Sequence, residues 1–185
     1  MKRIIFILVV LALFGCKEEE KPKIVEDLKE LKTMYEQDQA DRQDLSDWKK
    51  IMRNDSIHLK RVKELLDSSL IQTGKDHYRA AMIFQHGNDS IDSGLAVKMM
   101  KKAVALDTTI NKWLLAAAID RDLMRRNKPQ IYGTQFTRSE GEPWRRYKID
   151  STKVTDEVRK SYGVRTLAEQ RKKVKELNER EDLND

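Results

Sequence analysis

The chain has 185 residues, of which 39% are hydrophobic, 37% charged and 6% aromatic, and it contains seven Gly, three Pro and one Cys. This composition excludes a collagen-like chain and a disulfide scaffold, and it favours helices over a β-sandwich or barrel. The net charge of +6 arises from 37 basic and 31 acidic residues that are interspersed, unlike the one-sided basic surface typical of nucleic-acid binding. We therefore expect one helical domain and no nucleic-acid partner.

The N-terminus predicts export and lipidation. A basic start precedes the unbroken apolar run 4–14, which is about half the length that spans a bilayer. The run ends in Leu13-Phe14-Gly15-Cys16, which resembles a bacterial lipobox, in which the cysteine is acylated and becomes the mature N-terminus. Residues 1–15 are thus predicted to be a signal peptide, and residues 16–23 a charged spacer whose acyl chains, such as palmitate, tether the protein to a membrane.

The residues that follow the predicted anchor bear on location. Cys16-Lys17-Glu18-Glu19 resembles the export signal with which Bacteroidota lipoproteins reach the cell surface. We expect an outer-membrane lipoprotein, and the sequence leaves open whether it is displayed on the cell surface or faces the periplasm. The membrane is the expected partner through Cys16, and an envelope protein or a small polar ligand is the expected further partner.

The first amphipathic helix is predicted from residue 24. Apolar residues recur at steps of four and three over 24–35 and again over 45–52. Asp38 and Arg42 interrupt this stripe between its two halves, and their spacing of four places them on the same helix face.

Six further helices are predicted along the chain from their apolar periods and their end signals. A cap at Asn54 or Asp55 begins the second helix, and a cap at Asp92 or Ser93 begins the fourth. The expected ranges are 55–73, 75–85, 93–106, 112–127, 156–162 and 166–181, within a helical domain over 24–181 and before a frayed tail at 182–185.

Residues 130–150 have no helical period. Aromatic residues flank a turn at Ser139-Glu140-Gly141-Glu142-Pro143, which predicts a small hairpin or an extended loop. The expected fold class is therefore all-α, a bundle of about six to seven helices with this loop or hairpin after the fifth helix.

One ordered string carries a family resemblance. Lys128-Pro129-Gln130-Ile131-Tyr132-Gly133-Thr134-Gln135, with Asp38-Gln39, Arg42, Gln85-His86 and Asp120-Arg121 before it, is similar to the domain-of-unknown-function family 6624. The resemblance extends over residues 33–175, and it implies no particular reaction because the family carries no established activity. A looser similarity links residues 96–107 to the second helix of a tetratricopeptide repeat.

Asp120 is the acidic residue that most needs a partner. It falls on the apolar stripe of the predicted helix at 112–127, where an unpaired carboxylate is costly to bury. Its candidate partners are Arg42 and the backbone N–H groups of Tyr132-Gly133-Thr134, where Gly133 provides a positive φ or a close backbone approach.

Two interpretations follow for the polar residues. In the first, Asp38, Arg42, Asp120, Arg121 and Gln135 form an internal network that clamps the loop to the bundle. In the second, these residues converge with His86 and Tyr132 on a polar ligand. The full candidate set is Asp38, Gln39, Arg42, Gln85, His86, Asp120, Arg121, Gln130, Tyr132, Gly133, Thr134 and Gln135.

The sequence favours a binding or interaction module over an enzyme. No phosphate-binding loop, nucleophile elbow or H-E-x-x-H zinc motif occurs, so no cofactor and no metal are expected. The rival interpretation is a hydrolase-like enzyme in which His86 acts as acid or base beside Asp120 in a polar pocket. The third is a purely structural envelope component with tetratricopeptide-like helix packing.

Overall fold

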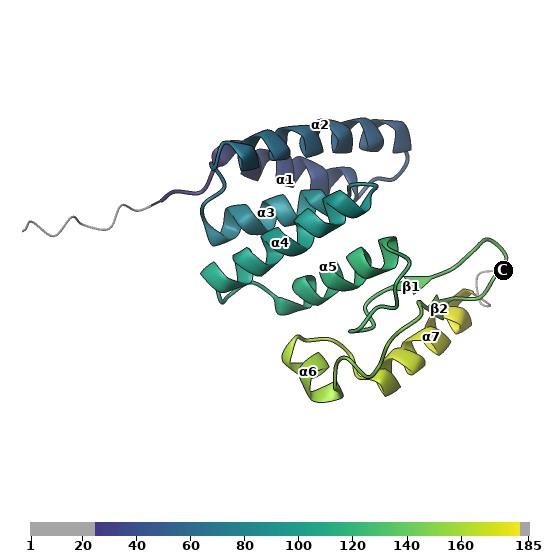
Figure 1. Ribbon diagram of the computed structural model, residues 1–185. Helices are drawn as coiled ribbons and strands as arrows, with labels where there is room; N and C mark the ends of the chain where they lie inside the picture. Colours follow the sequence, from purple (N-terminus) through teal and green to yellow (C-terminus); the bar gives the residue numbers. More distant parts are fainter. Residues whose placement is uncertain (1–24, 182–185) are drawn as a thin grey trace, which may run out of the picture.

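The computed structural model describes residues 25–181, and in that part of the chain seven helices and one small sheet make a predominantly all-α protein (Figure 1). The predicted fold class is therefore confirmed. The elements are α1 Lys29–Asp41, α2 Trp48–Asp67, α3 Gly74–Phe84, α4 Ser90–Leu106, α5 Lys112–Arg125, β1 Phe136–Thr137, β2 Arg145–Arg146, α6 Asp156–Ser161 and α7 Leu167–Glu181. The predicted signal peptide and Cys16 lie outside the described residues.

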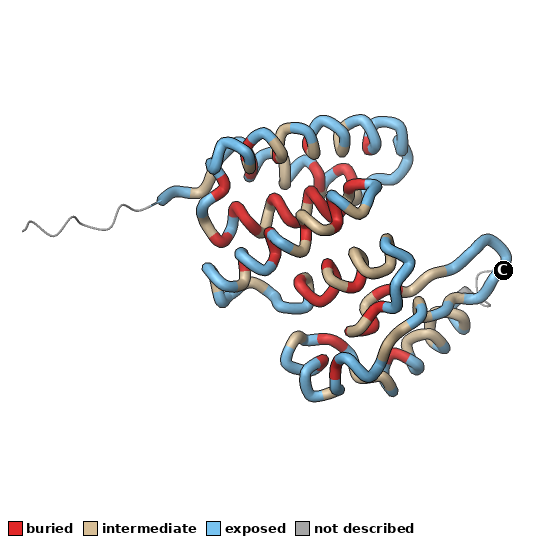
Figure 2. Tube along the Cα trace, in the orientation of Figure 1, coloured by how far each residue is buried: buried red, intermediate tan, exposed pale blue. Residues whose placement is uncertain are grey.

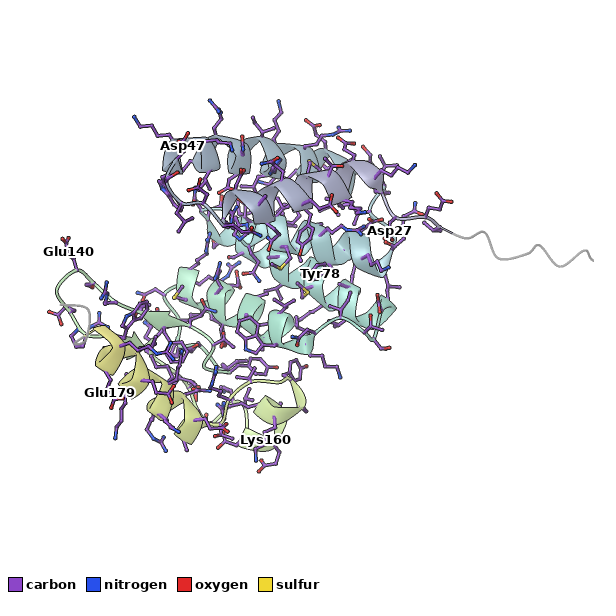
Figure 3. The ribbon with its side chains drawn as sticks, turned by 180° about the vertical axis from the view of Figure 1, so that it is seen from behind. Asp27, Asp47, Tyr78, Glu140, Lys160 and Glu179 are labelled. Carbon is purple, nitrogen blue, oxygen red and sulfur yellow. The ribbon has the colours of Figure 1, made fainter. Side chains whose placement is uncertain are left out.

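Helices α1 to α5 run back and forth and stack on one another in a single helical array (Figure 1). The main hydrophobic core lies between them, and Figure 2 shows that the buried residues of α3, α4 and α5 concentrate on the facing sides of these helices. Leu31, Leu65, Phe84 and Met99 are at most 1% exposed, and burying each side chain of this size contributes about 1.5–3 kcal/mol. Tyr78, labelled in Figure 3, packs edge-on against Tyr35 of α1.

The break between the first two helices differs from the prediction. Helix α1 ends at Asp41, and α2 begins after Asp47, whose side chain accepts a hydrogen bond from the Lys50 N–H. The predicted cap at Asn54 or Asp55 is wrong, because both residues lie inside α2 and use their side chains to contact α1 and the loop after it. The chain turns where the apolar stripe is interrupted, so polar contacts replace an apolar face there.

Helix α4 also begins earlier than predicted. Its N-cap is Asp89 rather than Asp92 or Ser93, since the Asp89 carboxylate accepts from the N–H groups of Ile91 and Asp92, both at 2.8 Å. Helices α3 and α5 begin near their predicted positions, after the side-chain caps Thr73 and Asn111.

The predicted hairpin after the fifth helix is present. Strands β1 and β2 pair antiparallel with Phe136 opposite Arg146, and the connecting turn, marked by Glu140 in Figure 3, extends away from the helices. Helix α7 packs against β2. A second, smaller core of Ala116, Tyr132, Val154 and Val164 joins this C-terminal part to α5.

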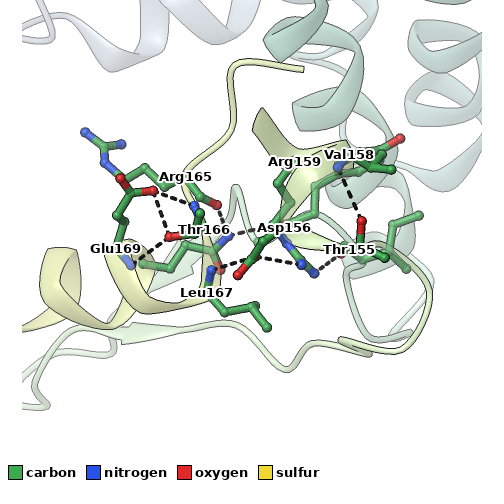
Figure 4. Close-up of polar contacts among 12 residues, drawn as sticks. Thr155, Asp156, Val158, Arg159, Arg165, Thr166, Leu167 and Glu169 are labelled. Carbon is green, nitrogen blue, oxygen red and sulfur yellow. Dashed lines mark hydrogen bonds and ion pairs between the residues drawn. The ribbon is translucent and has the colours of Figure 1, made fainter. Parts of the chain in front are cut away.

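The junction between α6 and α7 is held by side chains that accept from backbone N–H groups (Figure 4). Asp156 accepts from the Leu167 N–H at 3.0 Å and pairs with Arg159 at 3.1 Å. Thr166 and Glu169 form a capping box at the start of α7, in which Glu169 accepts from the Thr166 N–H at 2.7 Å. Among residues 25–181, no helix combines the length and the hydropathy needed to cross a membrane.

Candidate functional site

Asp38 is the centre of a polar cluster between α1 and α3. Its carboxylate is 1% exposed, and one of its oxygens lies 2.8 Å from His86 Nδ1 and 3.1 Å from an Arg42 nitrogen, while the other accepts from Gln39 at 2.8 Å. Because an ionised carboxylate only accepts hydrogen bonds, His86 Nδ1 carries a proton. In the neutral ring, Nε2 is then left with a lone pair.

Arg42 extends this cluster to α2. It donates to the Asp55 carboxylate at 2.8 Å and to the main-chain oxygen of Asp38 at 2.9 Å. Asp38, Asp55 and His86 each have one possible ligand atom in this cluster, and the three atoms lie within 4.8 Å of one another. Groups at this spacing could hold a metal ion. The Arg42 guanidinium already contacts both carboxylates and supplies the positive charge there, so a metal ion would have to displace it.

Arg121 and Arg125 lie four residues apart on α5 and point toward the end of α3. Arg121 donates to the main-chain oxygen of Gln85 at 3.4 Å, and Arg125 donates to those of Gln85 and Gly87. Neither guanidinium has a carboxylate partner within the described part of the chain. Burial lowers the pKa of the half-buried Arg121, and the positive charges of Arg125 and Arg42 lower it further. The larger hollow described below also carries carboxylates, but Asp55 pairs with Arg42, Asp92 pairs with Lys63 and Asp89 accepts from the first N–H groups of α4, so the unbalanced positive charge is that of Arg121.

Gln85, His86 and Arg121 line two adjoining hollows, and we call these three residues the polar trio. The larger hollow has a volume of about 740 Å³ and extends over α2 and the α3–α4 turn. The smaller has a volume of about 360 Å³ and extends over α5 and β1. Since the hollows share the polar trio, we treat them as one cleft, and the volume of each hollow lies in the range of small-ligand sites.

Asp120 does not line this cleft. Its carboxylate is 0% exposed, and its two oxygens accept from the backbone N–H groups of Ile131, Tyr132, Gly133 and Thr134 at 2.8–3.0 Å. The Thr134 hydroxyl donates to it at 2.8 Å. Of the two predicted kinds of partner, the turn backbone is therefore correct and Arg42 is not.

The predicted single network is thus divided in two. Asp38 and Arg42 hold His86 at the cleft, whereas Asp120 holds the loop at 131–134, so His86 pairs with Asp38 and not with Asp120. Tyr132 is enclosed as well: burial and a hydrogen bond to Tyr162 raise the pKa of its phenol to about 12. It packs in the small core instead of facing a ligand.

The rest of the predicted loop string is structural, with two exceptions. Gln130 is 0% exposed, and its side chain bonds the main chain of Gln135 and Tyr147, which ties the loop to the residue that follows β2. Gly133 has a φ of +91°, and a Cβ there would meet the Gln170 side chain at 2.0 Å, so both expectations for this glycine are confirmed. Gln135 and Thr134 also line the smaller hollow.

Several important residues were not singled out in the sequence. Arg159 and Gln170, both 1% exposed, donate to the Tyr132 main-chain oxygen and hold the loop from its far side. The sequences of α6 and α7 are rich in charged residues, and no pattern in them marks Arg159 or Gln170 as buried. Arg125 has a detectable signal, because it lies four residues after Arg121 on the same helix face.

The prediction that the second half of the first apolar stripe faces the core is wrong; these residues form the wall of the cleft at the start of α2. Leu45, Trp48 and Met52 continue the apolar stripe that the sequence assigns to a helix face in the core, yet they are 61%, 58% and 54% exposed. The chain turns before Trp48, so this half of the stripe faces the cleft instead of the bundle interior.

Comparison of the chain with family models, with curated proteins and with solved structures finds no match. The resemblance to family 6624 therefore stays a prediction.

Proposed function

We propose that this protein is a binding module that holds an anionic group, a carboxylate or a phosphate, at the polar trio. The observation that carries the proposal is Arg121: a half-buried guanidinium that has a carbonyl acceptor but no carboxylate partner among the described residues. A planar guanidinium matches a carboxylate or phosphate with two parallel hydrogen bonds. An anion placed there would also offset the repulsion that Arg121 experiences from Arg125 and Arg42.

One neighbouring group supports an anion at this position. The carboxamide of Gln85 offers two N–H donors in a residue that is 7% exposed and lines both hollows.

Thermal shift with small anions tests this function. In the full-length protein, millimolar inorganic phosphate or succinate is expected to raise the melting temperature, because a ligand that binds only the folded state stabilises it. Arg121→Gln is expected to abolish the shift, and Arg53→Gln, an exposed arginine of α2 outside the cleft, should retain it. Equal shifts in both variants, or no shift in the wild type, would refute the proposal.

We also propose that the module is an outer-membrane lipoprotein tethered through Cys16. The support is the order of the basic start, the apolar run 4–14 and the lipobox-like sequence before the charged spacer. Cys16→Ser is expected to move the protein from the membrane fraction to the soluble fraction and to abolish incorporation of labelled palmitate. A membrane-bound Cys16→Ser protein would overturn this proposal.

A hydrolase is the second candidate, and one contact favours it. The buried Asp38 orients His86, which is the arrangement in which Nε2 can accept a proton from water during hydrolysis. A panel of chromogenic esters and phosphate esters tests this alternative. Turnover that is lost in His86→Gln would support it, and the absence of turnover across the panel would contradict it.

A further inference from the structure

The two hollows of the cleft place apolar surface on both sides of the polar trio. On the α2 side, Leu45, Trp48 and Met52 are each more than half exposed. On the side of α5 and β1, the smaller hollow is lined by Trp113, Leu114 and Phe136. Large apolar side chains that remain exposed beside a cleft mark surfaces that bind another molecule.

Uncharged polar groups accompany the apolar walls in both hollows. Ser56 and Asn88 line the larger hollow, and Thr134 and Gln135 line the smaller one. The Gln85 carboxamide lies between them and has no hydrogen-bond partner in the part of the chain that the structure describes, although its residue is 7% exposed. An amide offers both a donor and an acceptor, which is what the backbone of a peptide requires.

These features separate a peptide from other anions with apolar parts. A lipid anion would place acyl chains against Ser56, Asn88 and Gln85, and these polar groups would lose water without gaining hydrogen bonds. An extended peptide places alternate side chains on opposite sides and presents N–H and C=O groups between them. Its acidic side chain meets the unpaired charge of Arg121, and apolar side chains before and after it meet the two walls.

We propose that the cleft binds an extended peptide in which one acidic side chain stands between two apolar side chains. The proposal rests on the anion-binding function proposed above and names its ligand class. The carboxylate pairs with Arg121, the peptide backbone bonds the Gln85 carboxamide, and the flanking side chains pack on Trp48 and Phe136. A cleft open to solvent along both hollows accommodates a segment inside a longer chain, so no free peptide terminus is required.

Five capped pentapeptides test the proposal by calorimetry with the full-length protein. Three are acidic probes: acetyl-Leu-Gly-Glu-Gly-Leu-amide and the same peptide with Met or with Phe in place of both Leu residues. Two are controls made from the Leu probe: Gln replaces Glu in one, and Ala replaces both Leu residues in the other. We expect the Leu probe to bind about tenfold more tightly than either control, a factor equivalent to about 1.4 kcal/mol.

Matched variants assign each part of the probe to its wall. Arg121→Gln is expected to remove the preference for Glu over Gln, while the control Arg53→Gln retains it. Arg121→Lys keeps the positive charge and provides a second variant at this position if Arg121→Gln fails to fold. Trp48→Ala is expected to remove the preference for Leu over Ala. Ile57→Ala should retain this preference, because Ile57 is exposed to the same degree as Trp48, 58%, but lines neither hollow.

The outcomes separate this inference from the anion-binding function. Equal affinities for the Glu and Gln peptides, or a Leu preference that survives Trp48→Ala, would overturn the peptide proposal. If phosphate or succinate binds and none of the acidic probes does, the peptide proposal falls and the anion site stands. If neither the small anions nor the probes bind, both proposals fall.

Discussion

The Asp120 carboxylate is the residue on which the loop at 131–134 depends. A fully buried negative charge is normally costly, but here five donors, four of them backbone N–H groups, surround it. The loop has no regular secondary structure of its own, so these hydrogen bonds replace the ladder that a helix or strand would provide.

Asp120→Asn is therefore expected to destabilise the protein by about 3 kcal/mol. The amide nitrogen of Asn must face one pair of N–H donors, which then have no acceptor. Asp122→Asn is the control on the same helix; it weakens a partly exposed ion pair with Arg126 and should cost less than about 1 kcal/mol. Urea unfolding measures both free energies, and equal losses would contradict this role of Asp120.

Substitutions at two glycines with positive φ distinguish the cost of backbone strain from the cost of close packing. Gly133 has a φ of +91° and faces the Gln170 side chain, whereas Gly141 has a φ of +74° and nothing within 4 Å. We expect Gly141→Ala to cost about 1 kcal/mol, the strain of a left-handed residue alone. Gly133→Ala should cost about 3 kcal/mol or more, because Gln170 must also move. Urea unfolding of the two variants decides this, and similar losses would mean that Gln170 moves freely.

At the scale of the elements, the sequence predicts the helices better than it predicts their ends. The apolar period predicts a helix wherever one occurs after residue 28, but the capping residues predict the first break at 54 or 55, and the structure has it at 42–47. Asp47, Asn54 and Asp55 are all good caps, and the choice among them depends on which side chains meet α1 in three dimensions.

The cap of α4 provides a test at this scale. Asp89 accepts from two backbone N–H groups at the start of the helix, so Asp89→Ala is expected to cost about 1 kcal/mol. Asp89→Ser keeps a capping oxygen and should recover most of that stability in urea unfolding. If Asp89→Ala unfolds like the wild type, the first turn of α4 is held by its packing alone.

At the scale of the whole molecule, a buried histidine links stability to pH. Burial lowers the pKa of His77, whose Nδ1 lies 3.4 Å from the Met99 sulfur between α3 and α4. The unfolded chain, with an ordinary histidine pKa of about 6.5, then binds more protons than the folded chain as the pH falls below that value. The free energy of unfolding contributed by His77 is thus intact above about pH 6.5 and decreases as the pH falls.

His77→Gln isolates this contribution. Urea unfolding between pH 7.5 and pH 5 should show a smaller decrease in stability for the variant than for the wild type. The Asp41 carboxylate titrates outside this window: the hydrogen bond from Asn54 lowers its pKa, so its contribution is lost only below about pH 4. Parallel curves for the two proteins would show that His77 protonates without cost.

The sequence by itself determined the helical class and the need of Asp120 for a partner, and it included the hairpin and the turn at Tyr132-Gly133-Thr134 among its alternatives. These features depend on local periodicity and on a buried charge close to its partners along the chain. Only the tertiary structure decided that Asp38 pairs with His86, that Arg121 lacks a carboxylate partner in the described region, and that Trp48 faces a cleft. Each of these depends on residues more than 30 positions apart or on the direction in which the chain turns, and side-chain spacing within one helix carries neither kind of information.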